Sequence, residues 1–201
     1  MTRHSCDGCE HGPTGVLKAE HRVIERVVDA LERMIDRRPF ERDFFARAID
    51  FLREFTDGCH HAKEEHELFP TLEAAGVPRE RGPIGCMLAE HARGRELVRR
   101  MSDLLDGAAR GDADSGAAFE MAVRSYVELL RQHIWKEDNV LFGMADRVLD
   151  TQGREALGRA FDAAGRAAGG AERHERHVHI ADELHRHAFA AASARTEGSA
   201  S

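Results

Sequence analysis

Apolar residues recur at intervals of three and four along most of this chain, which is the spacing of one face of an α-helix. The first such stretch follows residue 16, a longer one runs from about Arg42 to Ala75, and two more cover about 84–105 and 119–148. Short polar segments that contain glycine or proline separate them. The pattern predicts an all-α fold, an up-down-up-down four-helix bundle over residues 16–150.

The two ends of the chain differ from this central part. Residues 1–15 are polar and are expected to form a flexible segment. Residues 151–192 are rich in Ala, Gly and Arg, and they predict a C-terminal helical extension that packs against the bundle, with helices near 153–166 and 171–192. Residues 193–201 are expected to be a disordered tail.

Polar side chains stand at core positions of all four predicted helices. One histidine falls on the apolar face of each predicted helix, which we call its seam. On the second and fourth helices a glutamate follows that histidine four residues later. Residues i and i+4 lie one above the other on a helix face, so each His-x-x-x-Glu pair points into the same space. The core positions concerned are His21, His60, Glu64, His91, His133 and Glu137.

An internal repeat relates the two halves of the chain. The segment that begins at His60 reads HHAKEEHELF and the segment that begins at His133 reads HIWKEDNVLF, so both match H-x-x-K-E-[ED]-x-x-L-F. Before them, the sequence LKAEH ending at His21 parallels MLAEH ending at His91. Each half is therefore expected to be a helix pair that offers one histidine from its first helix and a His-x-x-x-Glu from its second.

The chemistry of these residues points to metal. Buried imidazoles and carboxylates are unfavourable unless they are paired or bound to a cation, and the seams offer no comparable set of buried cations. Nitrogen and oxygen donors without cysteine favour iron, manganese or zinc, and this arrangement in a helix bundle is typical of di-iron proteins. We expect two non-haem iron ions, joined by the glutamates and by an oxo or hydroxo bridge, with two histidines on each ion.

At these residues the sequence resembles the hemerythrin-like, or HHE cation-binding, family of bacterial type, over approximately residues 16–150. The family's His-x-x-x-Glu-Glu motif matches the segment from His60 to Glu65. The resemblance implies a metal site on the six positions named above.

Two alternatives for the ligands stay open at this point. The invertebrate oxygen carriers of the family take an aspartate five residues after the fourth-helix histidine, which makes Asp138 the alternative to Glu137. The pair His61 and Glu65 has the same spacing, shifted by one residue along the chain. It is the alternative to the pair His60 and Glu64. The carriers also have a second histidine on the third helix that this chain lacks, and a count of four histidines leaves the ions less saturated. This departure argues against simple reversible oxygen carriage.

The function that the resemblance implies is binding of dioxygen or a related small molecule, peroxide or nitric oxide, for sensing, storage or delivery. An enzyme that decomposes hydrogen peroxide or reacts with nitric oxide is the alternative, and a helical protein with a structural metal is a further one. Tyr126 lies two turns before His133 on the same seam. It is a candidate to hydrogen-bond a metal-bound oxygen, with an ordinary core tyrosine as the simpler interpretation.

Charge and composition limit the classes of binding partner that we expect for this protein. The net charge of -7 comes without a basic stripe, so a nucleic-acid partner is not expected. Residues 1–15 lack the apolar core that a secretion signal needs, and the sequence shows no uncharged apolar run of ~18 residues, so we expect a cytoplasmic protein with no membrane partner. Cys6 and Cys9 form a lone Cys-x-x-Cys, a weak metal or redox signal. The late histidines are expected on a solvated helix: His174, His177, His179, His185 and His187.

Overall fold

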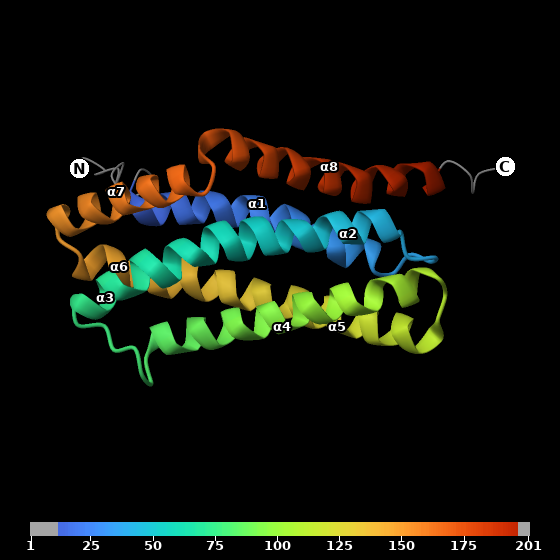
Figure 1. Ribbon diagram of the computed structural model, residues 1–201, viewed down its shortest axis with the longest axis horizontal. Coiled ribbons are helices and arrows are strands. Elements are labelled where there is room, and N and C mark those ends of the chain that lie inside the picture. Colours follow the sequence, from blue (N-terminus) through green and yellow to red (C-terminus); the bar gives the residue numbers. More distant parts are fainter. Residues whose placement is uncertain (1–11, 197–201) are drawn as a thin grey trace, which may run out of the picture.

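The computed structural model describes residues 12–196, with side chains through residue 190, and this part of the chain is entirely helical. Four long helical stretches run side by side (Figure 1). The first, third and fourth begin with α1 (Pro13–Met34), α4 (Pro83–Ala109) and α5 (Ala113–Lys136). The second begins with α2 (Arg42–Phe51). Contacts join α1 to α2, α2 to α4, α4 to α5 and α5 to α1, so the stretches close into a ring. The predicted four-helix bundle is confirmed.

Helix boundaries follow from local sequence. Both α1 and α4 begin with a proline, whose missing N–H is harmless in a first helical turn. The α5 helix begins after Asp112, whose carboxylate accepts a hydrogen bond from the backbone N–H of Ser115 at 2.7 Å. Just before it, Gly111 has a φ of 85°, which suits glycine and turns the chain from α4 into α5.

Two of the long stretches contain π-helical turns, in which the backbone bonds close a wider ring than in an α-helix. The second stretch continues from α2 through η1 (Leu52–His61) and η2 (Glu64–Leu68) to α3 (Phe69–Ala74). The fourth continues from α5 through η3 (Glu137–Leu141) to α6 (Phe142–Val148). These turns lie at the His-x-x-x-Glu segments of the repeat.

The predicted seams are correct up to the π turns. On the fourth stretch the seam is buried from Phe119 to Glu137. Continuing the three-four spacing of the sequence beyond Glu137 predicts Val140 and Val148 as further core positions, but they are exposed, by 45% and 41%. The wide turn of η3 inserts one extra residue and moves the buried face one position along the chain. The residues buried instead are Leu141, Phe142, Ala145 and Leu149.

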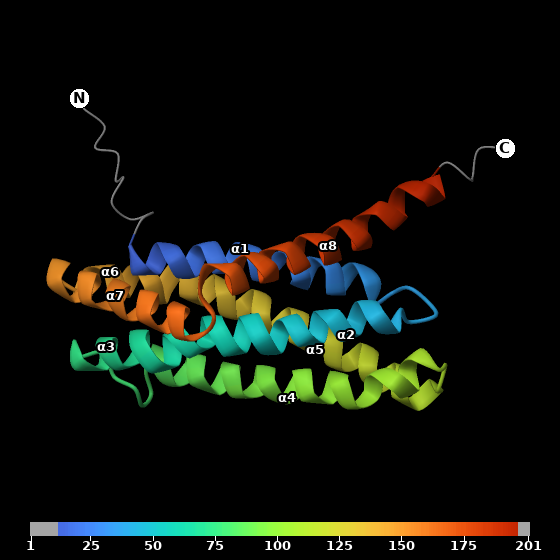
Figure 2. The same cartoon turned by 45° about the horizontal axis from the view of Figure 1, so that its top comes forward.

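The C-terminal extension consists of α7 (Thr151–Ala167) and α8 (Gly170–Thr196). The long α8 helix lies along α1 and α2, on one side of the bundle (Figures 1 and 2). It is attached by buried apolar side chains such as Leu184, and by an ion pair of Arg26 with Asp182. The α8 helix continues beyond residue 193, where the sequence predicts a disordered tail. At the other end of the chain, α1 begins at Pro13, whereas the sequence predicts that the bundle begins at residue 16.

Among the late histidines, His177 departs from the expected solvated helix. It is buried, its Nε2 lies 3.3 Å from Glu54, and its ring packs against Phe55. Cys6 and Cys9 lie outside the described residues, as do residues 197–201. No helix within residues 12–196 combines the length and apolarity needed to cross a membrane.

Candidate metal centre

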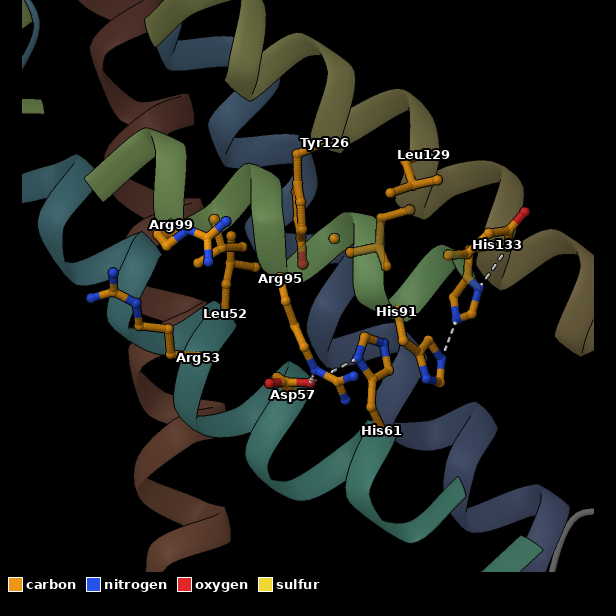
Figure 3. A pocket seen from close by; sticks show the side chains of 14 residues that line it. Leu52, Arg53, Asp57, His61, His91, Arg95, Arg99, Tyr126, Leu129 and His133 are labelled. Atoms are coloured by element: carbon orange, nitrogen blue, oxygen red, sulfur yellow. Dashed lines mark hydrogen bonds and ion pairs between the residues drawn. The ribbon is translucent and has the colours of Figure 1, made fainter. Parts of the chain in front are cut away.

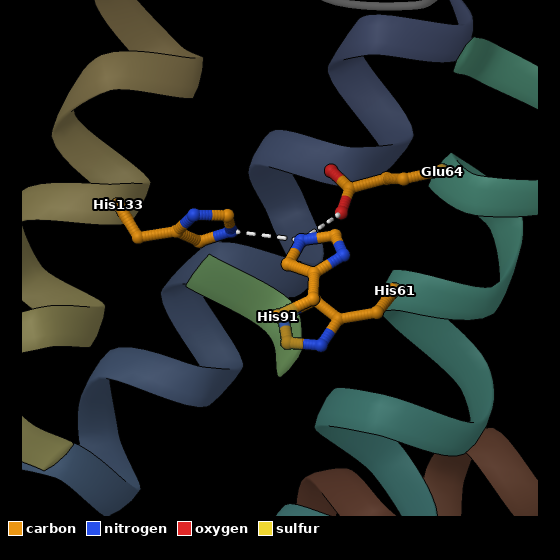
Figure 4. A group of neighbouring side chains, drawn as sticks. All are labelled: His61, Glu64, His91 and His133. Atoms are coloured by element: carbon orange, nitrogen blue, oxygen red, sulfur yellow. Dashed lines mark hydrogen bonds and ion pairs between the residues drawn. The ribbon is translucent and has the colours of Figure 1, made fainter. Parts of the chain in front are cut away.

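The fold brings all six predicted ligand positions together at one buried point. Each of these residues is at most 1% exposed. They fall into two groups, within which one donor atom from each residue lies within 4.8 Å of the others. The first group contains His21, His60, Glu64 and Glu137. The second contains His61, Glu64, His91 and His133 (Figure 4).

Two carboxylates lie between the groups. Glu64 belongs to both, with Oε1 3.5 Å from His60 Nε2 and Oε2 3.5 Å from His91 Nε2. Glu137 Oε2 lies 3.2 Å from His21 Nε2 and 3.3 Å from His133 Nε2. Each glutamate is therefore within reach of both groups.

Several of the donor atoms at this point lack hydrogen-bond partners in the described part of the chain. This holds for both carboxylate oxygens of Glu64, both of Glu137, and Nε2 of His21 and His60. Burying them unpaired is unfavourable, whereas a cation would satisfy them all. Without a cation, burial and the charge of Glu137 raise the pKa of Glu64 well above its ordinary value. The residues present fit a metal centre.

A second layer of carboxylates holds the imidazoles from outside. Four histidines place Nδ1 against a carboxylate while Nε2 faces the centre, an arrangement that fixes the tautomer and the ring orientation of metal-binding histidines. The Nδ1 distances are 2.8 Å from His21 to Asp138, 3.1 Å from His60 to Glu20, 2.7 Å from His91 to Glu65 and 3.0 Å from His133 to Glu90.

This layer follows the internal repeat. Glu20 and Glu90 each precede a first-helix histidine and pair with the repeat lysine, Lys63 or Lys136. Although burial opposes it, the contacts with His60 and Lys63 lower the pKa of Glu20 to about 2. The lowered pKa values keep Glu20, Glu65 and Glu90 ionised at neutral pH, and each of these carboxylates also pairs with a lysine or arginine side chain.

The chain as a whole can be compared with known proteins. Residues 12–145 match the family described as the Hemerythrin HHE cation binding domain. The chain belongs to this family. The match covers more than half of the chain and includes every residue of the two donor groups. The resemblance found in the sequence is confirmed.

Several curated proteins are similar to this chain. An uncharacterized protein of Mycobacterium tuberculosis is 27% identical over 130 residues, which cover 63% of this chain and 50% of the relative. An iron-sulfur cluster repair protein, YtfE, of Edwardsiella ictaluri is 32% identical over 102 residues, 50% of this chain and 46% of the relative. The chain thus spans about half the length of the curated relatives it matches. No solved structure matches it.

Within this hemerythrin domain the structure distinguishes inner from outer acids. Glu64 and Glu137 lie at the centre, fully buried, whereas Glu65 and Asp138 lie outside it and accept from imidazole Nδ1 atoms. The two acids that the sequence leaves as alternative ligands therefore belong to the outer layer.

The sequence did not predict that His61 lies at the centre together with the other six residues. His61 was an alternative to His60, but both converge on the centre, which raises the histidine count from four to five. His61 lies three residues and His60 four residues before Glu64, and both spacings bring side chains to one helix face. The repeat concealed this signal, because the counterpart of His61 in the second half is Ile134.

A cavity of about 260 Å³ reaches the second group, and His61, His91 and His133 line its inner end (Figure 3). Arg95 lies at its edge and links two outer acids, with Nε 2.7 Å from Asp57 and Nη2 2.6 Å from Glu65. The side chain of Tyr126 extends into the same space from α5. The candidate tyrosine is therefore placed on the approach to the three histidines.

Proposed function

We propose that this hemerythrin-family chain is a non-haem di-iron protein whose centre binds dioxygen or a related small molecule for sensing, storage or delivery. The supporting observation is the pair of buried donor groups that share Glu64. Two groups, each of suitable size for one ion, favour a two-ion centre over a single structural site.

The donors favour iron. Imidazole and carboxylate make up both groups, without a cysteine, and this donor set inside a helix bundle is typical of di-iron sites. His61, His91 and His133 would hold one ion and His21 with His60 the other, with Glu64 and Glu137 between them. When bound, such a pair supplies redox-active metal to which dioxygen, peroxide or nitric oxide binds.

The protein's own residues prepare this site. The outer carboxylates keep Nε2 of each imidazole directed inward, and phenylalanine rings such as Phe69 and Phe142 pack against the imidazoles and exclude water. The cavity beside His61, His91 and His133 offers a small molecule a route to one side of the centre.

The fifth histidine bears on oxygen carriage. A count of four argued against reversible binding, since the ions would be less saturated than in the oxygen carriers of the family. With His61 included, the candidate set contains five histidines and two carboxylates, so that argument no longer applies. Reversible binding is thus the first candidate.

A second candidate is an enzyme that acts on peroxide or nitric oxide, or that contributes to iron-sulfur repair. The observation in its favour is the relative from Edwardsiella ictaluri, which is named an iron-sulfur cluster repair protein. The match covers only half of each chain, so this activity is a proposal for the present protein.

Metal analysis tests the proposal first. We expect two irons per purified chain, and Glu64→Ala should lower the content of both ions because Glu64 faces both groups. A control substitution, Glu67→Ala, removes an acid that belongs to neither group. Zinc at one ion per chain would contradict the proposal and favour a structural site.

Reactivity then separates the two candidates. The anaerobically reduced protein is exposed to air and returned to vacuum while its visible absorption is followed. A band that forms and disappears over repeated cycles supports reversible binding. Irreversible oxidation, together with oxygen release from added peroxide that is lost in His133→Ala, supports the enzyme instead.

A further inference from the structure

The cavity beside the three-histidine group has two chemically different ends. Its inner end is formed by His61, His91 and His133, and Arg53 and Arg99 lie at the opposite end (Figure 3). Between them the lining is mostly apolar, with the ring of Tyr126 extending across the space. The apolar lining residues are Leu52, Val98, Leu129 and Leu130.

Two of the arginines carry charge that the protein does not neutralise closely. Arg95 is engaged by Asp57 and Glu65. Arg99, in contrast, has no carboxylate within 4.0 Å among the described residues, and the nearest such contact of Arg53 is Asp50 at 4.0 Å. Both guanidinium groups line the cavity and are solvent-exposed, so an anion can reach them.

The cavity is larger than a diatomic molecule requires. An apolar cavity of about 150 Å³ is sufficient to bind benzene in another protein. The volume of about 260 Å³ here accommodates one ring with a substituent. Two acidic side chains of the lining, Asp57 beside His61 and Glu90 beside His133, disfavour a ligand that carries more than one negative charge.

We propose that this cavity is a binding site for a small organic monocarboxylate about the size of benzoate. Its carboxylate lies against Arg53 and Arg99, and its apolar body packs on Tyr126 and the neighbouring leucines. This site goes beyond the proposed function, and its walls do not depend on which metal the centre holds.

The test compares benzoate with benzamide, a neutral molecule of nearly the same shape. Calorimetry on the purified full chain gives the affinities, and NMR of protein labelled at tyrosine reports the position, since Tyr126 is the only tyrosine. We expect benzoate to bind at least about tenfold more tightly than benzamide and to shift the Tyr126 ring signals.

Substitutions locate the carboxylate. The double variant Arg53→Gln/Arg99→Gln should weaken benzoate binding on the order of tenfold or more and abolish the preference over benzamide. Arg100→Gln is the matched control, because Arg100 follows Arg99 on α4 but does not line the cavity. Gly94→Leu should block both ligands, since a Cβ at Gly94 would already lie 3.7 Å from the Tyr126 ring.

Three results would overturn the proposal. The first is that neither ligand binds. The second is that benzoate binds no more tightly than benzamide. The third is that benzoate affinity is unchanged in the double arginine variant. The last result would place the carboxylate at the histidine end. The arginine variants change exposed side chains and leave the core intact, so the test does not depend on whether Gly94→Leu folds.

Discussion

The ring of His61 stacks on the ring of His91, with centroids 3.8 Å apart and planes inclined by only 14°. Both rings belong to the second donor group, although they come from different long helices. The presence of His61 also makes the centre asymmetric, because the second half of the repeat has Ile134 at the equivalent position. The two ion sites are therefore expected to differ in histidine number and in strength.

Replacing His61 by its repeat counterpart tests this asymmetry. In His61→Ile the group with His91 and His133 loses a donor, while the group with His21 and His60 keeps all of its own. We expect the iron content, measured by elemental analysis, to fall from two ions toward one per chain. His66→Ile is the control, since His66 belongs to neither group. An unchanged content of two in His61→Ile would contradict a ligand role for His61.

The outer carboxylates should control metal affinity without touching the ions. Glu65 accepts from His91 at 2.7 Å and is bound by Arg95, and the contact with His91, although burial opposes it, lowers the pKa of Glu65 to about 2. Removal of such a partner typically weakens metal binding by about 10- to 100-fold. We expect Glu65→Ala to show a loss of this size in chelator competition.

The control for this loss is Glu67→Ala, on the same helical turn. No imidazole or guanidinium group of the described residues lies within 4.0 Å of the Glu67 carboxylate, so its removal should leave the competition curve unchanged. If Glu65→Ala and Glu67→Ala behave alike, the outer carboxylates only contribute surface charge.

Much of this centre could be predicted because the sequence repeats itself. Burial of histidine and glutamate on four apolar seams can be predicted from spacing alone, and the six residues selected in this way lie together in the fold. The outer layer of carboxylates was harder to predict from the sequence. Glu20 and Glu90 stand directly before His21 and His91 in the repeat, but only the fold shows that they bind the histidine of the neighbouring helix.

Two of the errors share one physical origin. Spacing arguments assume a constant α-helical period, whereas η1, η2 and η3 widen the helix at the centre. Beyond η3 the buried face moves by one residue, so a constant α-helical spacing wrongly predicts Val140 in the core in place of Leu141. Near η1, the assumption of a single register made His60 and His61 alternatives when both are present at the centre. A strictly periodic pattern does not reveal such turns.

Tyr126 gives a test of the pH dependence of folding. Burial raises the pKa of Tyr126 above its ordinary value of 10.0, and the charge of Asp57 adds to the shift. The unfolded tyrosine ionises near pH 10, so this contribution to stability is complete below pH 10 and is lost as the pH rises above it. Because Tyr126 is the only tyrosine, ultraviolet phenolate absorption reports on it alone.

We expect no phenolate signal well above pH 10 as long as circular dichroism shows the helices intact. In urea, the same titration should give a midpoint near 10. A phenolate signal that develops near pH 10 in the folded protein would contradict the burial of the hydroxyl.

The last prediction concerns whether the C-terminal extension is part of the folding unit. Leu184 of α8 is 1% exposed and lies in the same apolar cluster as residues of α1 and α2, which suggests that α8 and the bundle unfold together. Truncation of a buried leucine to alanine costs about 2–5 kcal/mol. Leu184→Ala should lower the free energy of unfolding by this amount in one cooperative transition, followed by circular dichroism in denaturant. Phe189→Ala, on the same helix but 43% exposed, should have a much smaller effect. If Leu184→Ala instead loses only the helicity of α8 and leaves the main transition in place, the extension is an independent attachment, and the bundle carries its own stability.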